Sequence, residues 1–118
     1  MPSYLTDEQQ FQSGPYKWNG TAWVRDALAS VGTTSQVADT GSSTTLIAAN
    51  LSRVGVSIVN DSSAALFIKT GTTASATDYT ARLVQHAYWE APYGYTGRVD
   101  GIWASDPGDG AARITEYT

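Results

Sequence analysis

The chain has 118 residues, a net charge of −4, a sequence pI of about 4.6 and no cysteine. Its seven Lys and Arg residues are scattered, so the sequence offers no basic patch for nucleic-acid phosphates. The lack of cysteine excludes disulfides, thiol catalysis and cysteine metal sites, and no apolar run approaches the ~20 residues that span a bilayer. We therefore expect one small domain, with or without an arm, that binds neither nucleic acid nor membrane.

The first twelve residues, MPSYLTDEQQFQ, lack both a basic start and an apolar stretch. This pattern predicts no signal peptide, so an extracellular location would need another route, such as release inside a virus particle. Residues 1–15 have few large apolar side chains, among them Phe11. We expect them to form an extended or partly helical arm that becomes ordered on a partner surface.

Residues 16–25, YKWNGTAWVR, predict an aromatic β-hairpin. Asn19-Gly20 favours a two-residue hairpin loop, because both loop positions need a positive φ. Tyr16 and the two tryptophans, Trp18 and Trp23, concentrate apolar area around this turn. Two hypotheses stay open: the hairpin caps the core of its own chain, or it docks on another protein through its aromatic side chains.

Residues 26–43 are small and polar, and this composition predicts a linker or a loosely held strand. We accordingly divide the chain into an N-terminal arm, hairpin and linker over 1–43 and a compact domain over 44–118.

Residues 54–69, VGVSIVNDSSAALFIK, are the most strongly patterned stretch. Val56 and Ile58 alternate in the first apolar run, Leu66 and Ile68 in the second, and β-branched residues fit a pleated sheet. The intervening NDSS residues have side chains that bond back to their own backbone and favour turns. The pattern predicts a β-hairpin with one buried face.

Further short strands, separated by Gly, Asn and Pro, predict an all-β fold: a small antiparallel β-sandwich or jelly-roll-like domain. The predicted strands are 44–48, 54–60, 64–69, 79–84, 87–91, 98–105 and 111–117. In the last strand, alternation predicts one exposed face with Arg113, Thr115 and Tyr117. The predicted core comprises Val56, Ile58, Leu66, Ile68, Ile102, Trp103 and Ile114.

Several segments resemble a β-domain common in tailed-bacteriophage structural proteins, over residues 44–118. The most specific are NDS at 60–62, Glu90 with PYGYTG at 92–97, and GIWA at 101–104. This resemblance implies a non-enzymatic virion component of the capsid-decoration or head-fibre type, located in the virion and assembled in the bacterial host cytoplasm. It also implies a homotrimer, and a small compact domain commonly gains stability by oligomerising.

The sequence predicts no catalytic, cofactor or metal site. His86 is the single histidine, and a polar or partly buried structural role is expected for it. No G-x-S-x-G elbow accompanies the Ser, His and Asp residues. The acidic DPGDG stretch at 106–110 resembles a calcium loop in composition but lacks the closing Glu, so a plain turn is the preferred interpretation.

The densest aromatic group lies in residues 88–103 and has two interpretations; its members are Tyr88, Trp89, Tyr93, Tyr95 and Trp103. In the preferred one, Trp89 and Trp103 fill the core while Tyr93 and Tyr95 cover a corner or a subunit contact; in the other, the group stacks on sugar rings. Glu90 lies in a strand that is otherwise apolar, so we expect it to be hydrogen-bonded or salt-bridged, with Arg53 and Arg98 as possible partners.

The leading expectation is a decoration or head-fibre protein whose partner is the major capsid protein or another virion protein. The alternative is a tail or receptor-binding accessory protein with a carbohydrate-binding β-domain. The predicted partner-binding residues are Phe11, Tyr16, Trp18, Trp23, Tyr93 and Tyr95.

Overall fold

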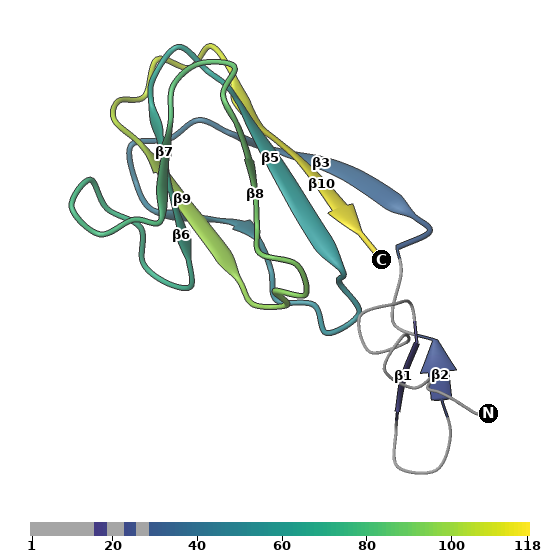
Figure 1. Cartoon of the computed structure of the whole chain (residues 1–118). Helices are drawn as coiled ribbons and strands as arrows, with labels where there is room; N and C mark the ends of the chain where they lie inside the picture. Colours follow the sequence, from purple (N-terminus) through teal and green to yellow (C-terminus); the bar gives the residue numbers. More distant parts are fainter. Residues whose placement is uncertain (1–15, 19–22, 26–28) are drawn as a thin grey trace.

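The computed structural model describes residues 16–18, 23–25 and 29–118, and its regular structure is entirely β (Figure 1). The part of the chain that it describes holds no helix able to cross a bilayer. The strands are β1 (Tyr16–Trp18), β2 (Trp23–Arg25), β3 (Gly32–Ala38), β4 (Thr44–Ile47), β5 (Gly55–Asp61), β6 (Leu66–Thr70), β7 (Ala81–Leu83), β8 (Tyr88–Glu90), β9 (Val99–Trp103) and β10 (Ala111–Tyr117).

Strands β3 to β10 form two four-stranded sheets, with strand orders β3-β10-β5-β8 and β4-β9-β6-β7. All pairs of neighbouring strands are antiparallel. Counted from β3 as the first strand, these orders become 1-8-3-6 and 2-7-4-5, which is the order of a jelly roll. The predicted antiparallel β-sandwich is thus confirmed, in its eight-stranded jelly-roll form.

The core lies between the two sheets, where period-two alternation turns one side of each strand inward. Six of the seven predicted core residues are buried, from Val56 to Ile114 along the chain. Ile102 is the exception: it lies opposite Phe67 across the β6–β9 pair, on the outer side of its sheet, and is half-buried. Trp103 fills the core as predicted. Trp89 is partly exposed and packs against this core.

The predicted hairpin over residues 54–69 is wrong. β5 pairs with β10 and β8 in one sheet, whereas β6 pairs with β9 and β7 in the other. Residues 62–65 therefore cross from sheet to sheet rather than turn the chain back on itself. The turn chemistry of the NDSS residues was correctly identified, since the Ser62 amide donates to Asn60 Oδ1 at 3.2 Å.

The residues predicted to be a linker or loosely held strand include an edge strand of the sandwich. β3 pairs with β10 over seven residues, from Gly32 opposite Tyr117 to Ala38 opposite Ala111. Next to it, the Ser30 and Val31 amides donate to the Thr118 carbonyl at 2.9 and 3.0 Å. The sheet therefore begins at Gly32, and a boundary at residue 44 would cut through it.

The aromatic hairpin is present as β1 paired with β2. Its register places Trp18 opposite Trp23, and the predicted Asn19-Gly20 loop lies outside the described residues. The predicted arm, Phe11 included, lies outside the described residues.

Candidate functional site: a tyrosine-lined sheet face

The outer face of sheet β3-β10-β5-β8 presents a regular grid of side chains, because register and alternation align every second residue across the four strands. A polar row crosses the middle of the face. It comprises Glu90, Ser57, Thr115 and Thr34, which are direct neighbours from β8 to β3. Ser57 is buried, so a ligand lying across the strands would meet the carboxylate of Glu90 and the hydroxyls of Thr115 and Thr34.

Tyrosines lie on either side of this polar row. In one neighbouring row Tyr88 is followed across the sheet by Val59 and Arg113; in the other, Tyr117 lies between Gly55 and Gly32. Tyr88 is 56% exposed and Tyr117 is 38% exposed. Rows on one face repeat every two residues, roughly 6.6 Å apart, so the two tyrosine rows lie about 13 Å apart with the one polar row between them.

The Tyr88 phenol belongs to a hydrogen-bonded chain on this face. It bonds with the side chains of Glu90 and Ser57. The bond to Glu90 is the largest cause that raises the pKa of the Tyr88 phenol, and burial and the nearby Glu90 charge add to it. A Tyr88 held in its neutral form keeps a fixed O–H donor beside the Glu90 carboxylate.

Two glycines, Gly32 on β3 and Gly55 on β5, lie opposite Tyr117 on either side of it. A Cβ added at Gly32 would lie 3.4 Å from Tyr117 Cε1, and one added at Gly55 would lie 3.8 Å from Tyr117 Cδ2. With no side chain at either position, the ring has room beside the backbone of both neighbouring strands. Gly55 also leaves a hollow in the sheet surface next to the ring.

Two shallow hollows mark this region of the molecule. One, of about 250 Å³, is lined by Val54, Gly55, Val56, Glu90, Ala91, Tyr93 and Tyr117. The other, of about 340 Å³, is lined by Thr34, Ser35, Gln36, Arg113, Ile114 and Thr115. Thr115 and Tyr117 are two residues apart on one face of β10, so the hollows are neighbours along that strand.

The predicted partner-binding residues belong to different parts of the chain. Tyr93 is 70% exposed and lines the smaller hollow. Tyr95 packs against the core, and its hydroxyl donates to the Arg98 carbonyl at 2.8 Å. Tyr16, Trp18 and Trp23 lie in β1 and β2, and Phe11 lies outside the described residues.

Glu90 has the hydrogen bond expected for it, but it is not buried and neither candidate arginine is its partner. Glu90 is exposed and bonds with Tyr88. Arg53 instead donates from Nε to Glu116 at 2.8 Å, and Arg98 donates from Nε to Asp100 at 2.6 Å. The apolar neighbours of Glu90 in the sequence suggested a buried strand, whereas β8 is an edge strand whose outer side faces solvent.

Tyr88 and Tyr117 are the site residues that sequence analysis did not select. The exposed face of 111–117 was predicted, and Tyr88 was counted among the aromatic residues. The missing information was the register, which puts β5 between β8 and β10 and so brings the two rings onto one face.

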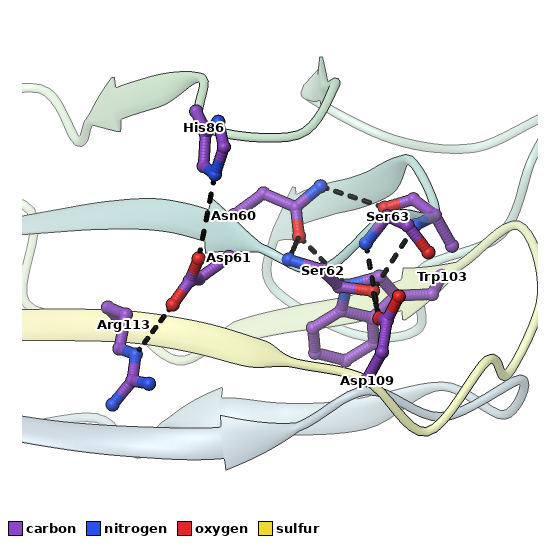
Figure 2. Close-up of polar contacts among 9 residues, drawn as sticks. Asn60, Asp61, Ser62, Ser63, His86, Trp103, Asp109 and Arg113 are labelled. Atoms are coloured by element: carbon purple, nitrogen blue, oxygen red, sulfur yellow. Dashed lines mark hydrogen bonds and ion pairs between the residues drawn. The ribbon is translucent and has the colours of Figure 1, made fainter.

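A buried polar cluster lies at the end of β5 (Figure 2). Asn60 Oδ1 accepts a hydrogen bond from Trp103 Nε1 at 3.1 Å. Ser62 Oγ lies 2.8 Å from Asp39 Oδ2 and 3.3 Å from Asp109 Oδ1. The 106–110 turn is therefore fastened to the 62–65 crossing, which agrees with the structural interpretation of the DPGDG stretch.

Beside this cluster, Asp61 lies between two basic side chains (Figure 2). Arg113 Nε is 3.2 Å from Asp61 Oδ2, and His86 Nε2 is 3.8 Å from Asp61 Oδ1. The His86 side chain is exposed, not partly buried, and its backbone has a φ of 69°. Among the described residues, no three His, Asp or Glu side chains form a group that could hold a metal ion.

Asp109 should give the fold a measurable pH dependence. Hydrogen bonds from the side chain and backbone of Ser63 lower the pKa of Asp109 below its ordinary 3.8. A carboxyl whose pKa falls on folding stabilises the fold above its unfolded pKa, and this contribution is lost as the pH falls through the folded value. We expect Asp109→Asn to be less stable than wild type at pH 7, with the difference shrinking below about pH 4.

Chemical denaturation of both proteins between pH 7 and pH 2 measures this difference. Asp106→Asn is the matched control, since Asp106 is an exposed aspartate in the same turn. A difference between Asp109→Asn and wild type that does not change with pH would contradict a role for the charge.

No family model, no curated protein and no solved structure matches this chain.

Proposed function

We propose that this protein is a structural component of a tailed-phage virion, most simply a capsid decoration or head-fibre protein without enzymatic activity. Its β-sandwich would be displayed on the outer surface of the capsid, and residues 1–28 would attach it to the major capsid protein or another virion protein. The chain would act as a homotrimer.

The observation that carries this proposal is the jelly-roll body preceded by a separately paired aromatic hairpin. Jelly rolls are common in viral capsid and lectin domains, although a fold alone does not fix a function. The resemblance of residues 44–118 to phage virion domains adds to the same case. Large aromatic residues such as those of β1 and β2 are the residue types that most often anchor interfaces.

The first test is the composition of the particle. Mass spectrometry of gradient-purified particles, from the phage whose genome encodes this chain, should detect the protein. Cryo-electron microscopy of those particles should show its copies on the outer capsid surface in groups of three. Absence from purified particles would refute the proposal, and copies on the tail would favour the second candidate below.

Attachment can be tested by rebinding the full-length protein to particles that lack it. We expect the double variant Trp18→Ala, Trp23→Ala to bind at least about tenfold more weakly, because each aromatic buried against a partner contributes roughly 1.5–3 kcal/mol. Leu51→Ala is the control, since Leu51 is 92% exposed in a loop of the sandwich. Equal rebinding of all three proteins would assign attachment to the sandwich.

A truncation used in this assay should begin at Ala29. A chain that starts at Gly41 would lack β3 and so would expose the edge of β10, to which β3 is paired over seven residues. Loss of binding by that shorter chain would report damage to the sheet and not the role of the arm.

The second candidate is a tail or receptor-binding accessory protein with a carbohydrate-binding β-domain. The tyrosine-lined face favours it, since exposed aromatic rings there border polar groups within one rigid sheet.

A further inference from the structure

The tyrosine-lined face has the composition of a site for a flat, polyhydroxylated ligand. Aromatic rings have a negative face that attracts C–H groups bearing partial positive charge, and one side of a sugar ring with equatorial substituents presents such groups. Tyr93 and Tyr117 supply exposed rings at one hollow. Stacking on either ring would leave the sugar hydroxyls directed sideways, toward the polar row.

The polar row supplies acceptors and donors for those hydroxyls. The Glu90 carboxylate accepts hydrogen bonds, while Thr115 and Thr34 can both donate and accept. The Tyr88 phenol, which also bonds with Ser57, is hydrogen-bonded to Glu90, so this carboxylate has a partner on the face before any ligand arrives. Binding groups fixed in advance lose less side-chain entropy on association.

The charges of this face select against an acidic ligand. Glu90 lines one hollow, and Asp61 lies on the same side of β5. Arg113, the cation beside the other hollow, already has two partners, with Asp61 Oδ2 at 3.2 Å and Gln36 Oε1 closer still. The net charge of the whole chain, −4, acts in the same direction.

We propose that the outer face of sheet β3-β10-β5-β8 binds a neutral oligosaccharide of glucose or N-acetylglucosamine units, stacked on Tyr93 and Tyr117 and hydrogen-bonded to Glu90. The two hollows adjoin along β10, so the chain of sugars extends over the polar row toward Thr34 and Gln36. This inference deepens the second candidate function and is also compatible with a capsid location. It concerns the sandwich face, so sugar binding and particle attachment can each fail without the other.

The test uses the isotope-labelled full-length protein, titrated with cellohexaose, with chitohexaose and with a hexamer of galacturonate. We expect cellohexaose, chitohexaose or both to shift the amide resonances of Glu90, Thr115 and Tyr117, and galacturonate to have no effect. Tyr93→Ala should weaken binding about tenfold, whereas Tyr93→Phe should retain it because the ring remains.

Two further variants separate a binding role from a folding role. Gly55→Val fills the hollow without removing an aromatic ring; a Cβ there makes only ordinary contact with Tyr117, so the fold should persist while binding is lost. Tyr79→Ala is the matched control, because Tyr79 is 42% exposed but packs, tilted by 56°, against Phe67 of the other sheet, with ring centroids 4.9 Å apart. Thermal melts confirm that each variant is folded.

Three outcomes would overturn the proposal. The first is that neither cellohexaose nor chitohexaose, each at about 10 mM, shifts any amide resonance. That concentration is well above the roughly millimolar Kd of a weak single site. The second is preferential binding of the galacturonate hexamer. The third is equal loss of binding in Tyr79→Ala and Tyr93→Ala, which would place the sugar elsewhere.

Discussion

Replacing Asn60 by Asp should destabilise the protein by about 3–5 kcal/mol, as expected when a buried charge is left uncompensated. Asn60 is completely buried, and its amide uses both of its polar atoms. Nδ2 donates to the carbonyls of Ala64 at 2.8 Å and Leu83 at 2.9 Å. Oδ1 accepts from the Ser62 amide at 3.2 Å and from the Trp103 indole at 3.1 Å.

These four bonds explain the size of the expected effect. Asn60 belongs to β5, whereas Leu83 and Trp103 belong to β7 and β9 of the opposite sheet. A carboxylate at this position would face two carbonyl oxygens where the amide donated two N–H groups, and its charge would have no access to water. Protonation would remove the charge, so the variant should regain part of its stability as the pH is lowered.

Denaturant unfolding, followed by circular dichroism, measures the loss. Asn50→Asp is the matched control, because Asn50 uses only its oxygen in the described contacts, accepting from the Ser52 amide at 3.0 Å. That substitution keeps the acceptor and should stay within about 0.5 kcal/mol of wild type. If the two variants proved equally stable, the Asn60 amide would not be what joins the sheets.

The role of Asn60 also shows why the hairpin prediction over residues 54–69 failed. Alternation correctly placed Val56, Ile58, Leu66 and Ile68 in the core, because period two depends only on which side of a strand faces inward. A hairpin and a crossing between sheets give the same alternation. The distinction lies in contacts made by Asn60 with Leu83 and Trp103, residues 23 and 43 positions away.

β3 illustrates a second limit of local patterns. Its sequence, GTTSQVA, contains a single medium-sized apolar residue, Val37, and both of its sides are largely exposed. Such a strand is held by backbone pairing with β10 rather than by burial, so hydrophobic periodicity does not reveal it. The tyrosine-lined face was hidden for a related reason, because it is created by the register between strands that are distant in the sequence.

Replacing Arg53 by Met should also cost about 3–5 kcal/mol, because it leaves buried acceptors without their donor. The Arg53 side chain is fully buried beside Glu116, whose side chain is 16% exposed. Nε donates to Glu116, and the two terminal nitrogens donate to the carbonyls of Gly97 at 2.6 Å, Tyr95 at 3.3 Å and Ala48. One guanidinium thus joins β10 to the loops after β4 and β8.

Arg53→Lys tests whether the several N–H donors of the guanidinium, rather than its charge, stabilise the fold. Arg53→Lys retains the charge but has a single nitrogen, which cannot reach acceptors on three sides, so we expect most of the stability to be lost. Arg82→Met is the matched control: Arg82 is exposed, with its guanidinium 6.0 Å from the Phe67 ring centroid, and its loss should cost less than about 1 kcal/mol.

A double substitution separates the ion pair from the carbonyl contacts. Replacing Glu116 by Leu together with Arg53→Met removes the orphaned carboxylate and should recover part of the lost stability, as apolar replacements of buried ion pairs often do. The recovery should be incomplete, since the carbonyls of Ala48, Tyr95 and Gly97 would still lack a donor. Full recovery would show that the ion pair alone sets the cost, and no recovery would show that the carbonyl bonds do; unfolding free energies of the four proteins in this cycle decide between them.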